Sequence, residues 1–502
     1  MQLKMWMLDV AREQHLSYEH LATFARLSLE AGYDAMGLYL EHRFAYPSVP
    51  WVHGNDCITP EMIAQLRRDF PALRLIPFIN LLGHFEGFLY TEGGAQFREA
   101  PLEGLQACPS NPDFIRLCEG MIDDILAAFD DEIIHIGGDE TAQLGQCQLC
   151  RARVEQSEAK PDVDGKAELY GAHFGPLAHR VVAAGRTPAL WGDMFLAHPS
   201  ALRYIPKESI IFDWQYFNGV AETAPKFTEQ GFRVVGCPCV ITYSATWCHL
   251  GATETNIREV AADVESGGLF GLCVTTWEIG MFAAYDSLFP ILRWATSDRS
   301  GPLVDWFGEG QKWAQMMSSD LEKFGGVFTS GRIRNSLKTR TLLMANPFLA
   351  WVHHGEELRG SHGKAILDHL DQALFHAQTE AERGVTLWAR AAVEWVRLAD
   401  DAAAEYAAGS PERAIAKLTL TRQLFDDLAK VARRTHQRIG GSLADIERCR
   451  IAREHVETVI KRLRQYGSGQ LGYRPAFEVL THPRFCPYDQ ASWWLINKWA
   501  NQ

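Results

Sequence analysis

Across the first 300 residues, two kinds of segment alternate, and this pattern constrains the fold more than any other feature. Short runs that are apolar on both faces are separated by segments whose apolar residues recur every three or four positions. A strand that is apolar on both faces belongs in a parallel sheet covered by helices. Eight such strands with helices between them predict a (β/α)8 barrel, and a doubly wound open sheet is the competing architecture.

The expected strands are residues 5–10, 34–40, 73–80, 132–137, 187–191, 209–214, 232–237 and 269–277. The expected helices are residues 18–31, 60–69, 111–129, 167–184, 220–229, 254–266 and 286–296, with a single turn at 198–204. Gly32, Gly185 and Gly231 each stand between a helical pattern and the next strand, where helices commonly end.

After residue 300 the strand-like runs stop and long helical patterns replace them, at 303–324, 333–343, 364–380, 385–408, 411–434 and 442–466. We therefore predict two domains. A (β/α)8 barrel occupies residues 1–300 and would carry any active site, and an α-helical C-terminal domain occupies residues 301–502.

The charge of the chain argues against polyanionic partners. Its 49 Lys and Arg residues and 62 Asp and Glu residues give a net charge of −13, without a basic cluster, so we expect neither a nucleic-acid nor a membrane partner. The apolar stretch before Asp9 is too short for a secretion signal. Together with 11 irregularly spaced cysteines, this predicts a cytoplasmic protein with reduced thiols.

In a barrel, functional side chains stand at the C-terminal ends of the strands. Here these positions hold mostly carboxylates and aromatic rings. They are Asp9 and Arg12; Glu41, His42 and Arg43; Asn80 and His84; Asp139 and Glu140; Trp191 and Asp193; Asp213, Trp214 and Tyr216; Tyr243 and Trp247; and Trp277 and Glu278. Aromatic faces pack on the C–H faces of sugar rings, while carboxylates and Arg bind hydroxyls. The set favours a carbohydrate pocket.

The fourth strand ends in the most specific motif, His135-Ile136-Gly137-Gly138-Asp139-Glu140. Neighbouring residues of an extended chain point to opposite sides, so Asp139 and Glu140 are not expected to form the facing pair of an ordinary retaining glycosidase. Two different roles are expected instead. An equally weighted structural alternative is an acidic helix N-terminus, in which Asp139 caps toward Ala142 or Gln143.

This hexapeptide resembles the signature of the family 20 glycoside hydrolases, the β-N-acetylhexosaminidases. Leu8–Arg12 is similar to the opening strand of that family, whose Arg holds sugar hydroxyls. Further residues fall in order at the family's pocket positions: His84, Trp191, Asp193, Trp214, Tyr243, Trp277 and Glu278. The resemblance covers residues 5–297 and is to the short form of the family, which lacks an extra N-terminal domain.

The resemblance implies an exo-acting enzyme that removes terminal, non-reducing β-linked N-acetylhexosamine from an oligosaccharide or glycoconjugate with retention. The 2-acetamido oxygen of the substrate would attack the anomeric carbon, so no carboxylate nucleophile is needed. Glu140 would act as acid and then as base, which requires a raised pKa that nearby Trp side chains could supply by desolvation. Asp139 would orient the acetamide and stabilise the oxazolinium, and Tyr243 would donate to the acetamide oxygen.

The resemblance also implies a set of substrate-binding residues and neither a cofactor nor a metal. Trp191, Trp214 and Trp277 would surround the acetamide methyl group, and Arg12 and Glu278 would bind distal hydroxyls. Glu41, His84 and Asp193 complete the expected pocket.

Three departures from the family pattern concern the O4 and O6 region of the sugar. Glu41-His42-Arg43 replaces the usual acidic stretch of strand two, Ser244-Ala245 follow Tyr243 where many members carry a second Asp, and Glu278 follows Trp277 directly. The choice between N-acetylglucosamine and N-acetylgalactosamine therefore stays open, and specificity for N-acetylgalactosamine is a serious alternative.

Two other functions stay open as well. One is a conventional retaining β-glycosidase with Glu140 as acid/base and Glu278 as nucleophile. The other is a sugar-binding barrel without catalytic activity. A homodimer formed through the helical domain is also left open.

Metal binding is the remaining question. Cys147-x-x-Cys150, together with Cys237, Cys239 and Cys248, could ligate zinc, although we favour free thiols. No His-x-His or His-x-x-x-His pair accompanies the histidines at the strand ends, His84 and His135, so we expect orienting or core roles for both.

Overall fold

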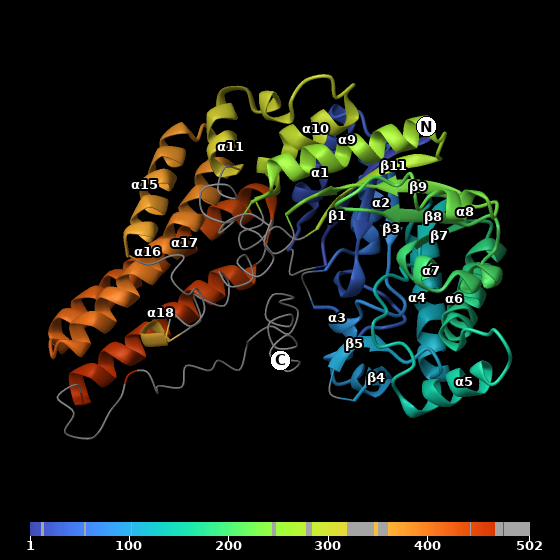
Figure 1. Ribbon diagram of the computed structural model, residues 1–502, viewed down its shortest axis with the longest axis horizontal. Helices are drawn as coiled ribbons and strands as arrows, with labels where there is room; N and C mark the ends of the chain where they lie inside the picture. The colour runs from blue at the N-terminus through green and yellow to red at the C-terminus, as the bar shows by residue number, and fades with distance from the viewer. Residues whose placement is uncertain are drawn as a thin grey trace.

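The computed structural model describes residues 1–11, 15–54, 57–101, 103–242, 247–277, 284–318, 346–349, 360–441, 443–466 and 475. Eight parallel strands follow one another around one sheet: β1 (Leu3–Asp9), β2 (Ala35–Tyr39), β3 (Arg74–Phe78), β6 (Ile133–His135), β7 (Thr187–Trp191), β8 (Ile210–Trp214), β9 (Arg233–Cys237) and β11 (Gly271–Thr276). Strand β1 pairs with both β2 and β11, so the sheet closes on itself (Figure 1). This closure confirms the predicted barrel and excludes the open sheet.

The helices of the barrel lie close to their predicted positions. They are α1 (Tyr18–Glu30), α2 (Pro60–Asp69), α4 (Pro112–Ala128), α6 (Gly165–Ala183), α7 (Asp193–Ala197), α8 (Pro225–Thr228), α9 (Leu250–Ser266) and α10 (Phe289–Thr296), with a 3-10 turn, η3, at Pro199–Tyr204. The helix expected at 220–229 is reduced to the short α8. Gly32, Gly185 and Gly231, which follow α1, α6 and α8, all have positive φ, as expected at helix ends.

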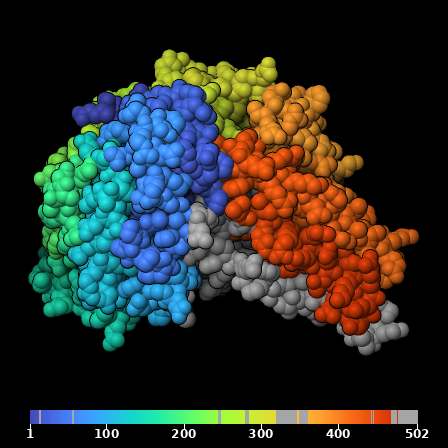
Figure 2. Space-filling view, turned by 180° about the vertical axis from the view of Figure 1, so that it is seen from behind, coloured from blue at the N-terminus to red at the C-terminus, as the bar shows by residue number. Residues whose placement is uncertain are grey.

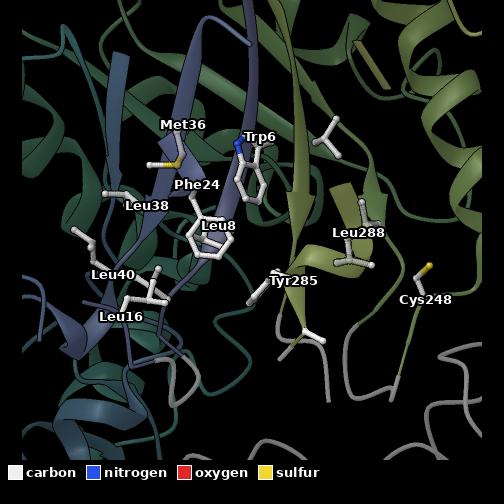
Figure 3. Close-up of a cluster of buried hydrophobic side chains, with 14 of the residues drawn as sticks. Trp6, Leu8, Leu16, Phe24, Met36, Leu38, Leu40, Cys248, Tyr285 and Leu288 are labelled. Carbon is white, nitrogen blue, oxygen red and sulfur yellow. The ribbon is translucent and has the colours of Figure 1, made fainter. Parts of the chain in front are cut away.

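Alternate residues of each strand enter two separate layers of apolar packing. Met5 and Met7 of β1 face the barrel interior, while Trp6 and Leu8 face the surrounding helices. Figure 3 shows this outer layer, in which Trp6 lies beside Phe24 of α1, with the ring centroids 6.0 Å apart. Because both strand faces are covered, the strands carry apolar residues at successive positions, which explains the pattern in the sequence.

Two insertions at the C-terminal end of the barrel were not predicted. The first, between β3 and α4, contains α3 (Glu86–Leu89) and an antiparallel hairpin of β4 (Arg98–Ala100) and β5 (Glu103–Ala107). The second, α5 (Gln148–Glu158), follows β6. These elements gather at one end of the molecule in Figure 1. Helix α5 buries a single residue, Cys150, so it lacks the apolar stripe by which helices are recognised in a sequence.

The C-terminal region is helical, as predicted. It contains the 3-10 turn η5 (Leu303–Gly310) and helices α11 (Gln311–Ser318), α15 (Gly360–His376), α16 (Glu380–Ala407), α17 (Pro411–Ile439) and α18 (Leu443–Tyr466). The helix expected at 333–343 lies outside the described residues. The boundary between domains at residue 300 stays a prediction.

The end of α17 contacts the barrel directly. His15 forms an isolated β-bridge with Gly441, and Arg438 forms an ion pair with Asp286. Figure 2 shows this contact from behind, where the N-terminal segment meets the C-terminal helices. No described helix combines the length and hydropathy needed to cross a membrane.

Candidate active site

Two glycines shape the chain at the end of the fourth barrel strand. Gly137 and Gly138 have φ values of 78° and 104°, which a residue with a side chain rarely adopts. A Cβ on Gly137 would lie 2.6 Å from Asn80 Oδ1 and 2.7 Å from the carbonyl oxygen of Ile79. The carbonyl oxygen of Gly138 accepts a hydrogen bond of 2.7 Å from the hydroxyl of Tyr170. The turn that carries Asp139 and Glu140 therefore needs glycine, because its backbone lies too close to its neighbours for a side chain.

Replacing Gly137 by Ala is expected to destabilise the protein and to lower its activity. The left-handed backbone costs about 1–2 kcal/mol, and the clash with the backbone of Ile79 adds a further ~1–3 kcal/mol. Gly185→Ala is the matched control, because Gly185 has a φ of 74° but nothing within 4 Å of its Cβ position. Denaturant unfolding of both variants measures the difference. Equal losses of unfolding free energy would contradict the packing argument.

Asp139 and Glu140 converge on one imidazole. The Nε2 of His84 lies 3.5 Å from Asp139 Oδ2 and 3.0 Å from Glu140 Oε2. The expectation that adjacent carboxylates point apart is wrong here, because Glu140 has a φ of 42° and is not extended. The backbone N–H of Glu140 also donates to Asp193 Oδ2 at 2.9 Å, which ties the turn to the end of β7.

The charges of these acids and of His84 shift one another's pKa values. Burial by itself would lower the pKa of His84, but the negative charges of Asp139, Glu140 and Glu86 raise that pKa to about 10. His84 is therefore an imidazolium at neutral pH. Burial, followed by the charge of Asp139, raises the pKa of Asp193 to about 7, against the hydrogen bond from the backbone of Glu140.

The two adjacent acids differ in exposure. The side chain of Glu140 is 49% exposed, whereas that of Asp139 is only 7% exposed. An exposed carboxyl can reach a leaving group and exchange protons with water, while a buried carboxylate provides a fixed charge. The expected enclosure of Glu140 by Trp side chains is not present among the described residues.

A connected set of aromatic rings reaches Asp193, which accepts from the backbone of Glu140. The Nε1 of Trp214 donates to Asp193 Oδ1 at 3.2 Å, and its ring lies 4.8 Å from that of Tyr216. The hydroxyl of Tyr216 accepts a 2.7 Å hydrogen bond from Trp277 Nε1. Trp214 and Trp277 are partly exposed, whereas Trp191 is fully buried, 6.2 Å from Trp277 between ring centroids. This places Trp191 below the surface formed by the other two Trp side chains.

His135 has the core role that we expected for it. Its ring is buried and stacks on Phe78 at 4.3 Å, and its Nδ1 accepts a hydrogen bond from the backbone of Gly137. Burial holds its pKa well below the ordinary value, so the ring is neutral. His135 therefore supports the glycine turn from inside the barrel.

The remaining predicted residues fall into two groups. Glu41 lies in the 3-10 turn η1 (Glu41–Arg43) after β2, where it is buried, and its Oε2 is 3.9 Å from His42 Nδ1. Arg12, Tyr243 and Glu278 lie outside the described residues.

The helix-cap alternative for Asp139 is wrong. The next helix, α5, begins only at Gln148 and is capped by the Cys147 side chain. The backbone N–H of Ala142 donates to the Glu140 carbonyl, and that of Gln143 donates to Gln106 Oε1.

Two contributors were missed in the sequence. Tyr170 lies in the middle of α6, where an aromatic residue gives no sign of a contact with Gly138. Glu86 lies two residues after His84, with its Oε1 3.9 Å from His84 Nδ1. A third acid that close to a candidate site residue was a signal that could have been used.

The model of the glycosyl hydrolase family 20 catalytic domain matches residues 95–268, which include Asp139, Glu140, Trp191, Asp193 and Trp214. Among curated proteins, none matches this sequence.

Several solved structures are similar to the chain. A β-N-acetylhexosaminidase from Bacteroides fragilis NCTC 9343 has a TM-score of 0.46 at 15% identity, over 62% of this chain and 71% of that one. An exo-β-N-acetylglucosaminidase from Vibrio harveyi, in complex with N-acetylglucosamine, has a TM-score of 0.49 at 18% identity, over 64% of this chain and 58% of that one. A chitobiase from Flavobacterium johnsoniae has a TM-score of 0.49 at 14% identity, over 93% of this chain and 72% of that one. The chain thus spans less than two thirds of the Vibrio harveyi enzyme.

Proposed function

Because residues 95–268 match the model of the glycosyl hydrolase family 20 catalytic domain, we propose that this protein is an exo-β-N-acetylhexosaminidase. It would remove terminal, non-reducing β-linked N-acetylhexosamine with retention of configuration, assisted by the acetamide of the substrate. The observation that carries the proposal is the pair Asp139 and Glu140, held on one imidazolium but differing in exposure.

In the first step, the acetamide oxygen attacks the anomeric carbon while the bond to the leaving oxygen breaks. Asp139 accepts the acetamide N–H and keeps a negative charge beside the cation that forms. Glu140 transfers its proton to the leaving oxygen. Tyr243 would donate to the acetamide oxygen, a role that comes from the resemblance of the sequence to the family.

In the second step, Glu140 takes a proton from water, and that water opens the oxazolinium at the anomeric carbon. Two inversions give net retention. His84 does not react in this scheme. Its imidazolium contacts Asp139 and Glu140 and neutralises part of the charge of Asp139, and Glu86 on its other side helps to keep it protonated.

The sugar would lie against the aromatic surface of Trp214 and Trp277, whose rings are partly exposed. Arg12 and Glu278 are proposed to bind its distal hydroxyls. Glu41 is proposed to act on the O4 side, so the turn at Glu41–Arg43 would influence the choice between the two epimers. The cytoplasmic location and the homodimer stay predictions.

Substrate assistance is tested by removing the acetamide from the substrate. Aryl 2-acetamido-2-deoxy-β-glycosides should be cleaved with a kcat/KM at least ~10³-fold above that of their 2-hydroxy counterparts, because the intramolecular nucleophile is lost. Steady-state kinetics on both types, each in gluco and galacto forms, measures assistance and epimer preference together. Equal cleavage of both types would favour Glu278 as a nucleophile, and tight binding without turnover would favour a binding protein.

A further inference from the structure

Three thiols and one carboxylate meet between the two unpredicted insertions, away from the acids of the active site. Glu99 lies in β4, Cys108 directly follows β5, and Cys147 and Cys150 stand at the start of α5. The Sγ of Cys108 is 3.5 Å from the Sγ atoms of both other cysteines. One ligand atom from each of the four residues lies within 4.8 Å of the other three.

These distances fit a tetrahedral metal ion. A zinc–sulfur bond of about 2.3 Å places two sulfurs about 3.8 Å apart. Cys147 and Cys150 have the Cys-x-x-Cys spacing of zinc sites, and the backbone N–H of Cys150 donates to Cys147 Sγ at 3.3 Å. That hydrogen bond favours a thiolate at Cys147. The donor set, soft sulfur with one oxygen, suits zinc rather than magnesium or calcium.

Glu99 provides an independent indication that this cluster suits a cation. Its side chain is fully buried, and Oε1 accepts a 2.9 Å hydrogen bond from the backbone of Cys147. Its other oxygen, Oε2, is buried and has no hydrogen-bond partner among the described residues. A buried carboxylate without a compensating cation is costly.

The surrounding protein supplies only indirect positive charge. Arg153 donates to Ser110 Oγ at 2.9 Å, and that oxygen lies 3.1 Å from Cys150 Sγ.

We propose that Glu99, Cys108, Cys147 and Cys150 bind one structural zinc ion. Four protein ligands leave no open position for water or substrate, so the site is structural rather than catalytic. The ligands differ from the set considered in the sequence, because Cys147 and Cys150 meet Cys108 and Glu99 instead of Cys237, Cys239 and Cys248. The expectation of free thiols at Cys147 and Cys150 is replaced by this proposal, which does not depend on the proposed glycosidase activity.

The ion would join the β4–β5 hairpin to the segment that follows Glu140. That segment already contacts the hairpin through Gln143, whose backbone donates to Gln106 and whose side chain donates to Glu103 at 2.7 Å. A few residues further along, the backbone of Cys147 already donates to Glu99, and the zinc would strengthen this attachment. It would thus hold the chain that begins with the two acids of the active site.

Metal content of the full-length protein, purified without chelators, tests the proposal by mass spectrometry of the elements. We expect close to one zinc per chain in the wild type and a loss of at least ~10-fold in Cys150→Ser and Cys108→Ser, because one thiolate ligand is removed. Cys449→Ser is the matched control, since Cys449 is a buried thiol of α18 outside the cluster, and it should keep its zinc.

Cobalt substitution of the wild type provides a second measurement that does not depend on how the variants fold. Cobalt bound by thiolates in a tetrahedral site should show intense visible bands and sulfur-to-metal charge transfer. Wild-type protein that contains no zinc and takes up neither zinc nor cobalt would overturn the proposal. So would zinc retained by both cluster variants, or a native mass lighter by two hydrogens, which would indicate a disulfide within the cluster.

Discussion

Glu140→Gln is expected to lower kcat/KM by about 10²–10⁴ for substrates with poor leaving groups, and far less for nitrophenyl glycosides. Gln keeps the shape of the side chain but cannot transfer a proton. A sugar or alkyl alcohol needs that proton to leave, whereas a nitrophenolate does not. The exposed Glu140 carboxyl, 3.0 Å from an imidazolium, is the group placed to deliver it.

A series of aryl glycosides with leaving groups of increasing pKa measures this effect. In the variant, the logarithm of kcat/KM should fall steeply with leaving-group pKa, and in the wild type only weakly. Glu86→Gln is the matched control, because Glu86 also faces His84 but from the Nδ1 side, 3.9 Å away. It should lower the rate modestly and equally for all leaving groups. An equally steep dependence in the Glu86 variant would remove Glu140 from the role of acid.

The barrel could be predicted from the sequence because its strands are covered on both faces. Runs such as Ile133–Ile134 and Ile210–Phe212 are apolar without interruption, which is typical of strands in a buried parallel sheet. The hairpin of β4 and β5 and the helix α5 carry no such pattern. Part of what holds them is polar: the backbone N–H of Gln143 donates to Gln106, and the Gln143 side chain donates to Glu103. Such contacts leave no periodic pattern in the sequence.

Four of the predicted site residues, Asp139, Glu140, His84 and Asp193, lie together in the structure, but their geometry was not predicted. The motif at strand four identified Asp139 and Glu140, and the positions of strand ends identified His84, Asp193 and Trp214. Left-handed backbone at Glu140 and His84, with φ of 42° and 46°, could not be foreseen, because neither residue is glycine. Such local violations are expected where function requires a particular orientation. The grouping of Cys108 with Cys147 and Cys150 was not predicted for another reason, because Cys108 is 39 positions from Cys147 in the sequence.

The imidazolium of His84 lies among several acids in this site. His84 contacts Asp139, Glu140 and Glu86, and Asp193, with a pKa of about 7, lies in the field of Asp139 and Glu140. Because these groups interact, the pKa values measured for them describe the group of residues together rather than any single residue. Substitution of any member shifts the titration of the others, which provides a readout of the cluster that is separate from catalysis.

Asp139→Asn is expected to slow the first chemical step by about 10²–10³, whatever the leaving group, because the fixed charge beside the forming oxazolinium is lost. The same substitution removes a charge that raises the pKa values of His84 and Asp193, so both pKa values should fall. Pre-steady-state or kcat/KM measurements over the aryl series give the rate, and NMR titration of the His84 ring gives its pKa. A lowered His84 pKa together with native-like unfolding would show that the variant is folded and altered only in charge.

Asp213→Asn separates this effect from the general loss of a buried carboxylate. Asp213 lies at the end of β8 and accepts hydrogen bonds from Gln215 and Thr223 rather than from His84. Its variant should change the first step less than ~10-fold and leave the His84 titration in place, because it adds no charge to the cluster. The loss in Asp139→Asn should also be absent on 2-hydroxy substrates, which have no acetamide to orient. Wild-type rates on 2-acetamido substrates in Asp139→Asn would exclude assistance by the acetamide, since an attack without a countercharge at that position would then cost nothing.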